Sequence, residues 1–211
     1  MNPNQSNELI DIQIHGATVR LPRQTVLANW LASLPANEPR PTDVPPSIGA
    51  AWPSQGGVYA GKMRGENGQP DYHLIVPSVD PHAVVEQAEM EEIKWGSAEK
   101  EETAATSESD GLANTRALIA SDNDHPAARW ASNLELYGHR DWYLPARREL
   151  ALCYATVPEL FEKSGYYWSS SQYSAYDAWG QDFAHGLQDG GLKDLALRAR
   201  AVRRFISHSA L

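Results

Sequence analysis

The chain is poor in cysteine: its 211 residues include only one, Cys153. A single thiol cannot form an intramolecular disulfide, so packing and hydrogen bonding must hold the fold together. This composition neither requires nor excludes an oxidising compartment. Cys153 shares one side of a predicted helix with Leu150 and Val157, which indicates a small core residue rather than a nucleophile.

Basic charge is also scarce. The chain has 18 Lys and Arg residues against 27 Asp and Glu residues, for a formal net charge of −9. Nucleic-acid binding depends on clustered basic residues, and so does attraction to an anionic membrane surface. The short pairs at 147–148 and 203–204 do not form such a cluster. We therefore expect no nucleic-acid partner and no binding to anionic membranes.

Long apolar runs are absent as well. No segment approaches the roughly 20 consecutive apolar residues that a membrane-spanning helix needs, so we expect no membrane insertion. Residues 1–8 contain neither the basic region nor the apolar stretch of a secretory signal. We therefore expect the protein to be made in the cytosol. A role outside the cell would need a route other than a cleaved signal.

The sequence offers no recognisable catalytic or metal-binding constellation. Seven histidines are dispersed, and no two have the spacing of metal ligands. Residues 122–124 resemble the start of a calcium loop but lack its glycine and closing glutamate, so we interpret them as a turn before a helix that starts at Pro126. No glycine-rich stretch has the form of a nucleotide loop. We therefore expect no metal, no cofactor, no catalytic residue and no enzymatic activity.

The residues that are present divide the chain into three parts. Residues 1–34 form a small element, in which alternation over 9–21 predicts a β-hairpin and the spacing over 26–34 predicts a short helix. Its apolar face packs either on the main domain or on other subunits. Residues 35–48 hold several prolines among polar residues, which is typical of a stiff linker. Residues 49–206 form the main domain.

The main domain begins with a second hairpin. Strands are predicted at 56–63 and 72–77, joined by a glycine-containing turn. A short helix is expected at 83–90. The acidic stretch 91–110 lacks apolar periodicity, and we interpret it as a surface loop. Three later stretches have helical spacing, the first of them only partly helical: 112–119, 127–134 and 146–156.

Aromatic anchors recur between residues 130 and 205. The relevant residues are Asn133-Leu134, Gly138, Asp141-Trp142-Tyr143-Leu144-Pro145, Glu149-Leu150, Tyr167-Trp168-Ser169-Ser170-Ser171, Ala178-Trp179, Phe183, Gly186 and Ala201-Val202-Arg203. This pattern resembles the C-terminal domain of the Legionella-type collagen-like adhesins, a domain of C-type-lectin-like fold. It is also similar to the variable proteins that retroelements diversify in phages and bacteria, including the phage major tropism determinant. The resemblance extends loosely to 56–95 and does not cover 1–48.

The resemblance implies an α+β, C-type-lectin-like fold with short strands, two helices and long loops. Trp142, Trp168 and Trp179 would be the large anchors of such a domain. Arg200 and Arg203 would clamp loops through carboxylates or carbonyls. Two departures matter. Ala146 stands where the family has Ser or Thr, so half of a helix capping box is missing, and the calcium motifs of sugar-binding animal C-type lectins are absent.

The expected ligand surface lies between the Tyr-Trp-Ser-Ser anchor and the closing strand. Tyr, Ser, Asp and Gly are enriched there, as in versatile binding surfaces that combine rigid amphipathic contacts with adaptable polar ones. The alternative interpretation is that these segments are solvated loops without a ligand. The candidate ligand-binding residues are Tyr173, Ser174, Tyr176, Asp177, Asp182, His185, Gln188 and Asp189, and the wider surface adds Gln172, Lys193 and Asp194.

These observations favour a non-enzymatic binding protein. The missing secretory signal and the N-terminal element with its proline-rich linker favour a phage virion protein of the tail or fibre that contacts phage tail proteins and recognises a host surface protein or glycan. The resemblance to phage receptor-binding proteins implies a homotrimer. An intracellular partner-binding or chaperone-like protein in the cytoplasm is the alternative. The formylglycine-generating enzymes share the fold but need paired cysteines or a metal triad, and this sequence shows neither.

Overall fold

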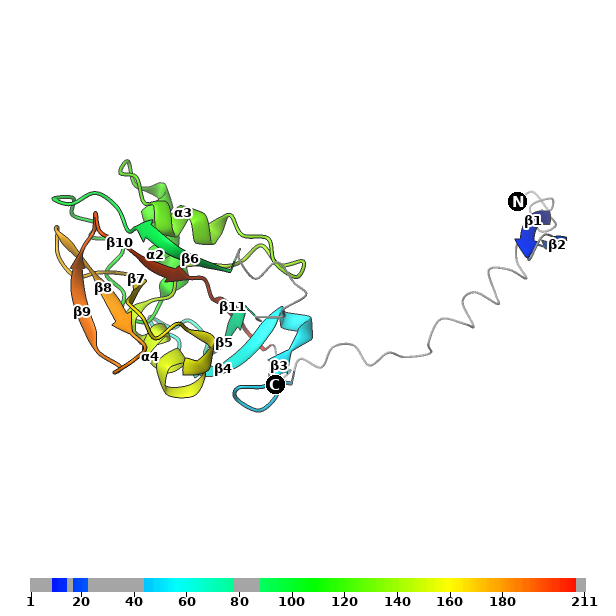
Figure 1. Ribbon diagram of the computed structural model, residues 1–211, viewed down its shortest axis with the longest axis horizontal. Helices are drawn as coiled ribbons and strands as arrows, with labels where there is room; N and C mark the ends of the chain where they lie inside the picture. Colours follow the sequence, from blue (N-terminus) through cyan, green and yellow to red (C-terminus); the bar gives the residue numbers. More distant parts are fainter. Residues whose placement is uncertain (1–8, 15–16, 23–43, 78–87, 208–211) are drawn as a thin grey trace. The chain divides into compact units, whose positions relative to one another are not determined.

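The computed structural model describes residues 9–14, 17–22, 44–77 and 88–207, and the chain divides into two units, 1–42 and 43–211. In the first unit, β1 (Leu9–Ile14) and β2 (Ala17–Pro22) pair antiparallel, with Leu9 opposite Pro22. The predicted N-terminal hairpin is therefore confirmed (Figure 1). The helix predicted at 26–34 and most of the proline-rich linker lie outside the described residues.

The second unit contains a four-stranded antiparallel sheet. Its order is β11-β5-β4-β3, built from β3 (Ala51–Trp52), β4 (Gly57–Met63), β5 (Tyr72–Pro77) and β11 (Arg203–Phe205). The hairpin of β4 and β5 matches the predicted strands closely. A short 3-10 helix, η1 (Pro53–Gln55), links β3 to β4.

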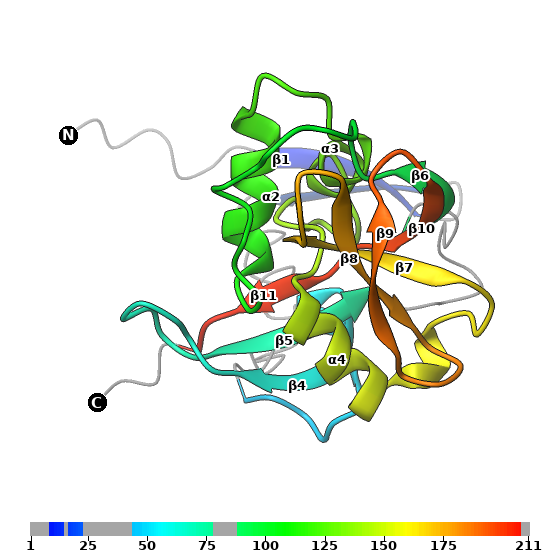
Figure 2. The same ribbon diagram turned by 90° about the vertical axis from the view of Figure 1, so that its left-hand side faces the viewer.

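The second sheet of this unit has the order β6-β10-β7-β8-β9. Its strands are β6 (Glu89–Lys94), β7 (Tyr166–Gln172), β8 (Asp177–Asp182), β9 (Gln188–Leu192) and β10 (Ala196–Arg200). Strands β10 and β7 run parallel, whereas the other neighbours are antiparallel. Strand β9 forms one edge of this sheet and β6 forms the other (Figures 1 and 2).

Strand β6 corrects two predictions. Glu89 and Met90 belong to this strand rather than to the end of a helix, and residues 83–87 lie outside the described part. The segment 91–110 is not a surface loop: it begins within β6, and Trp95, Glu102, Ala105 and Ser109 are buried. The prediction failed because the sequence of β6 shows no apolar alternation. This strand is stabilised by pairing with β10, which lies far away in the sequence.

Three α-helices occur in the described residues, at the three stretches with helical spacing, whereas the resemblance implied two: α2 (Gly111–Ala120), α3 (Pro126–Ser132) and α4 (Arg147–Thr156). The side chain of Asp110 caps α2 by accepting the Ala113 N–H at 3.0 Å, and Pro126 opens α3 as predicted. At α4, Glu149 Oε2 accepts the Ala146 N–H at 2.7 Å. The reciprocal bond is missing because the Ala146 side chain is a methyl group. A 3-10 helix, η3 (Pro158–Leu160), follows α4.

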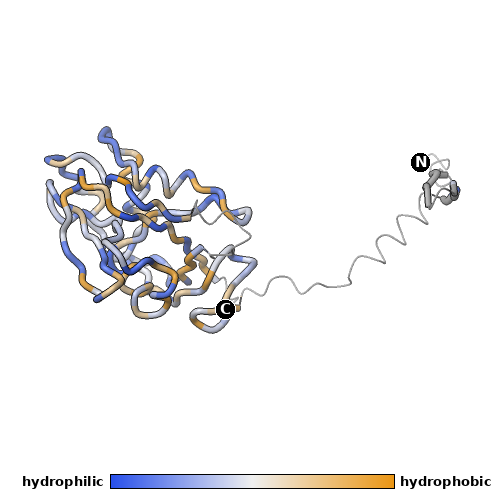
Figure 3. Tube along the Cα trace, in the orientation of Figure 1, coloured by the Kyte–Doolittle hydropathy of each residue, from blue (hydrophilic) through white to orange (hydrophobic). Residues whose placement is uncertain are grey.

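Two large apolar clusters form most of the core in the described residues, and a smaller one contains Trp52, Tyr59 and Ile75. One large cluster joins α2 and α3 to the five-stranded sheet through Trp95, Trp142 and Trp168. The other large cluster joins α4 to β4 and β5 and contains Cys153, whose burial confirms it as a core residue. Helix α4 contacts β4 of one sheet and β7 and β8 of the other (Figure 2). Hydrophobic and hydrophilic residues are interspersed along the trace of this unit (Figure 3).

The expected anchors divide into two kinds. Trp142 and Trp168 are buried, as predicted, but Trp179 is only half-buried. Successive side chains of a strand point to opposite faces, and Ala178 occupies the inward position next to Trp179. Trp179 therefore lies on the opposite face of β8, which α4 partly covers, and it is half-buried beside Arg147 at the start of that helix; we call this the outward face.

The two arginine clamps are confirmed. Arg200 donates to Glu89 at 2.6 Å and to the Pro77 carbonyl at 3.2 Å, and Arg203 donates to Asp141 at 2.5 Å and to Gln55 Oε1 at 2.7 Å. Each guanidinium therefore ties segments that are far apart in the sequence. In the described ranges, none of the helices has the length and apolar character that crossing a membrane requires.

Candidate functional site

A row of four side chains lies on the outward face of β8 and β9, and we call Tyr173, Trp179, Arg147 and Gln188 the aromatic row. The Tyr173 ring meets the Trp179 ring edge-on, with centroids 4.6 Å apart and an interplanar angle of 81°. Arg147 Cζ lies 3.6 Å from the centre of the Trp179 ring, at cation–π distance. Trp179 is therefore held between a tyrosine and a guanidinium.

Arg147 is fixed by hydrogen bonds as well as by Trp179. Its Nε donates to Gln188 Oε1 at 2.8 Å, and Gln188 Nε2 donates to the Arg147 carbonyl at 2.8 Å. Its NH1 group pairs with Glu108 at 3.0 Å. Side chains that are already held in one geometry lose little conformational entropy when a ligand binds. This half of the row is therefore preorganised.

Glycine at position 190 makes room for the other half. Gly190 pairs with Trp179 across β8 and β9. A Cβ atom at Gly190 would lie 3.0 Å from Tyr173 Cδ1, closer than most real Cβ contacts. The bare backbone of β9 thus lets the Tyr173 ring lie over it.

The turn from 173 to 177 presents both candidate tyrosines. Ser174 Oγ accepts the N–H groups of Tyr176 at 3.1 Å and of Asp177 at 3.0 Å, and it donates to Asp177 Oδ2 at 3.0 Å. Tyr173 and Tyr176 are 56% and 51% exposed. Ser174 and Asp177 therefore shape the turn, whereas the two rings face solvent.

Asp182 has a comparable shaping role in the turn after β8. It is buried, and its carboxylate accepts the N–H groups of Ala184 at 2.8 Å and of His185 at 3.1 Å, together with His185 Nδ1 at 2.9 Å. The hydrogen bond from Ala184 is the main factor that lowers the pKa of Asp182. His185 itself is exposed.

The structure places the predicted site residues along β8 and β9 but in two groups and at different depths: Tyr173 to Asp177 lie at the β7–β8 turn, and Asp182, His185 and Gln188 lie at the other end of β8. Four are exposed: Tyr173, Tyr176, His185 and Asp189. Three are half-buried: Ser174, Asp177 and Gln188. Asp182 is buried, and within the wider surface Gln172 and Lys193 are buried while Asp194 is exposed.

The sequence-based site prediction did not include Trp179 and Arg147 of the aromatic row, nor three exposed leucines near it. Trp179 was predicted as a core anchor, because the sequence alone does not show that Ala178, the preceding residue, points inward instead. Arg147 was not considered, because nothing local connects a residue at the start of α4 with β8. The exposed leucines are Leu187, Leu192 and Leu195.

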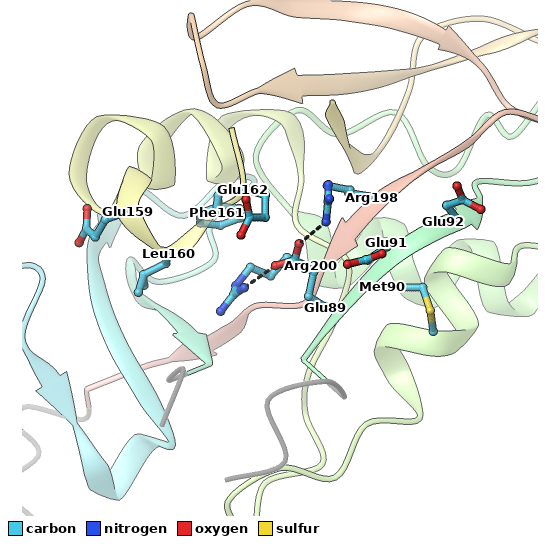
Figure 4. A pocket seen from close by; sticks show the side chains of 10 residues that line it. All are labelled: Glu89, Met90, Glu91, Glu92, Glu159, Leu160, Phe161, Glu162, Arg198 and Arg200. Carbon is cyan, nitrogen blue, oxygen red and sulfur yellow. Dashed lines mark hydrogen bonds and ion pairs between the residues drawn. The ribbon is translucent and has the colours of Figure 1, made fainter. Parts of the chain in front are cut away.

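A separate cavity of about 830 Å³ lies near the opposite edge of the sheet, between β6, β10 and residues 159–162 (Figure 4). Glu89 lies in its wall and accepts hydrogen bonds from Arg198, Arg200 and the Tyr167 hydroxyl. The glutamate charge is therefore matched by the two arginines. The other glutamates of the wall, Glu91, Glu92, Glu159 and Glu162, are exposed.

The described residues contain no group of three or more His, Cys, Asp or Glu side chains that could hold a metal ion. Burial raises the pKa of the Cys153 thiol, which keeps it protonated and unreactive. His125 is buried and bound to Glu102 at 2.9 Å, and His73 is buried and bound to the Tyr59 hydroxyl at 2.9 Å. These histidines contribute to packing and hydrogen bonding inside the domain.

Comparison with known proteins gives no match among curated sequences. The model of one protein family, the Lcl C-terminal domain, matches residues 86–203. The matched region includes α2, α3, α4, β6 to β10 and the whole aromatic row. It covers more than half of the chain and confirms the resemblance to the collagen-like adhesin domain. The chain therefore belongs to the Lcl C-terminal domain family, an adhesin-like family.

Proposed function

We propose that this protein is a non-enzymatic binding protein and that it recognises a partner macromolecule through the outward face of β8 and β9. The aromatic row supports this proposal best. It combines exposed aromatic surface with a guanidinium and an amide that are already fixed, and Tyr, Trp and Arg are the residues most often found at binding hot spots.

The surrounding surface adds to this argument. Leu192, which pairs with Asp177, and Leu195 are 47% and 46% exposed, and they extend the apolar area at the tyrosine end of β8. Asp189 in β9 and Asp194 just after that strand are exposed as well. An interface with an apolar centre and a polar rim is the usual arrangement for protein recognition.

We further propose that the protein acts in a phage virion, where the C-terminal domain binds a host surface protein or glycan and the N-terminal element contacts tail proteins. A homotrimer would present several copies of the row, and weak sites linked in this way bind together with higher avidity. The motive for this setting is the similarity to diversified phage and bacterial receptor-binding proteins together with the separate N-terminal hairpin. An intracellular partner-binding role in the cytoplasm is the second candidate.

A binding assay on intact bacterial cells tests the proposal. The full chain and its Tyr173→Ala and Tyr176→Ala variants would be compared at matched concentrations. A hot-spot tyrosine is worth about 2 kcal/mol or more, so at least one variant should bind more than about tenfold less tightly. Ile119→Ala, an exposed apolar change on α2, is the matched control. Binding of both tyrosine variants at the parent level would place the ligand surface elsewhere.

A further inference from the structure

Three separate segments of the domain meet at the end of the Lys193 side chain. Lys193 is fully buried, and its Nζ lies 2.6 Å from the Lys100 carbonyl, 2.7 Å from Gln172 Oε1 and 3.0 Å from the Ala175 carbonyl. We call these three oxygens and the amine the Lys193 site. Ala175 belongs to the turn that presents Tyr173 and Tyr176.

The orientation of Gln172 is fixed independently of the lysine. Gln172 Oε1 accepts the Glu102 N–H at 2.7 Å, while its Nε2 donates to Glu101 Oε1 at 2.7 Å. The oxygen of this amide therefore faces Lys193. All three partners of Nζ are acceptors, and only an ammonium ion has the three N–H groups needed to satisfy them. A neutral amine would point its lone pair at an oxygen.

The surroundings of the Lys193 site also suit a cation. The Trp95 ring centre lies 4.9 Å from Nζ, within cation–π range. Burial lowers the pKa of Lys193, while the carboxylates of Glu101, Glu102 and Asp177 act in the opposite direction. Oxygen acceptors, an aromatic face and nearby negative charge thus surround one position.

The backbone of Lys193 joins the same segments. Its carbonyl accepts the N–H groups of Trp95 and Gly96, each at 3.1 Å, and its N–H donates to the Tyr176 carbonyl at 2.9 Å. The side chain then ties Lys100 and Gln172 to Ala175. Lys193 therefore connects the 95–102 segment to the tyrosine-bearing turn at several points.

We propose that Lys193 is a built-in cation that positions the 173–177 turn for ligand binding, and that the site accepts a free monoalkylammonium ion when the side chain is removed. The link to ligand binding rests on the proposed function. The cation-binding property of the three oxygens does not.

Chemical rescue tests the proposal in the full chain. Lys193→Ala removes Cγ, Cδ, Cε and Nζ, and n-propylammonium supplies the same four heavy atoms. Amide hydrogen exchange at 173–177 and 100–102 should accelerate by about tenfold or more in the variant, and n-propylammonium chloride should restore the parent rate. Neither 1-propanol nor sodium chloride at the same concentration should do so. Lys163→Ala, an exposed lysine on the same domain, is the control and should leave these amides unchanged.

Two results would overturn the proposal: equal rescue by 1-propanol, which would mean that the lysine only fills space, or parent-like protection in Lys193→Met, which would mean that the charge is unnecessary. If Lys193→Ala does not fold, the ¹⁵N signal of Nζ in the unaltered protein replaces it. Three slowly exchanging protons on Nζ at neutral pH support the proposal, and two contradict it. None of these measurements uses the partner macromolecule of the proposed function. Parent-like cell binding by a Lys193→Ala variant with a loosened turn would therefore contradict the proposed binding role of that turn and leave the cation site intact.

Discussion

The hydroxyl of Tyr72 lies 2.5 Å from Glu149 Oε1 and 2.8 Å from the Ser109 carbonyl oxygen. A tyrosine hydroxyl has one proton, and a carbonyl oxygen can only accept. Tyr72 therefore shares its one proton between the two oxygens, and a protonated Glu149 would end this sharing by donating to Tyr72 instead. The Tyr143 hydroxyl, 2.7 Å from the same carboxyl oxygen, and the Ala146 N–H then complete the network as donors.

Glu149→Gln tests the protonation state of Glu149. Burial is the main factor that raises the pKa of Glu149 above its ordinary value of 4.5. A group whose pKa is higher in the folded state contributes stability at low pH and loses it as the pH rises toward the folded-state pKa. At pH 4 the free energy of unfolding of the variant should therefore lie within about 1 kcal/mol of that of the parent, because an amide can make similar hydrogen bonds. At pH 8 the free energy of unfolding of the variant should rise relative to that of the parent.

Urea unfolding of both proteins at pH 4 and pH 8 measures the difference. Glu162→Gln, an exposed glutamate, should show no comparable change between the two pH values. A loss of stability in Glu149→Gln that grows with pH would mean that the folded protein holds Glu149 as a carboxylate.

Trp168→Ala and Trp179→Ala should separate folding from binding. Trp168 is fully buried, and truncating a buried aromatic residue typically costs about 3–5 kcal/mol. Trp179 is half-buried on the outward face, so its truncation should lower stability less and reduce cell binding more than about tenfold. Thermal unfolding and cell binding of both variants give the comparison. Equal losses of stability would place Trp179 in the core after all.

Gly190→Ala should disturb the aromatic row without unfolding the domain. The new methyl group would lie 3.0 Å from Tyr173 Cδ1, and the exposed ring can move away. Binding should weaken while the melting temperature stays close to that of the parent. Gly57→Ala is the contrasting change, because its methyl group would approach the Val76 carbonyl, which belongs to the paired strand β5 and cannot move freely. It should cost about 1–3 kcal/mol, as overpacking usually does.

The domain should fold without a metal ion. Its clamps are arginines, and the described residues offer no metal-ligating cluster. Treatment with a chelator should therefore leave the melting temperature unchanged. A marked fall that added calcium or zinc reverses would indicate a metal site and contradict this prediction.

Residues 1–34 should promote self-association. Their hairpin is too small to be stable alone, and a proline-rich segment separates it from the main domain. Light scattering of the full chain should give the mass of a trimer, and a version that begins at Ile48 should give a smaller assembly. Equal monomeric masses for both proteins would contradict the trimer.

Local signals predicted part of the fold well. The β4–β5 hairpin, the start of α3 at Pro126 and the buried side of α4 follow from turn residues and periodicity. Strand β6 could not be predicted in this way, because its pairing with β10 depends on residues about a hundred positions away. The burial of each residue in the candidate site could not be predicted for the same reason. Asp182 and Lys193 lie in polar segments that resemble solvated turns, and they are buried only by contacts with residues from other segments.

The final strands have a consequence for how the protein is made. Strand β10 lies between β6 and β7 in one sheet, and β11 pairs with β5 in the other. Neither sheet can be completed on the ribosome until residues 196–205 have left the exit tunnel. Until then β5, β6 and β7 lack one of their hydrogen-bonding neighbours. Such long-range pairing makes folding slow and a nascent chain prone to misassembly. A ribosome that stops a few codons short of β10 would therefore release a chain that cannot close either sheet.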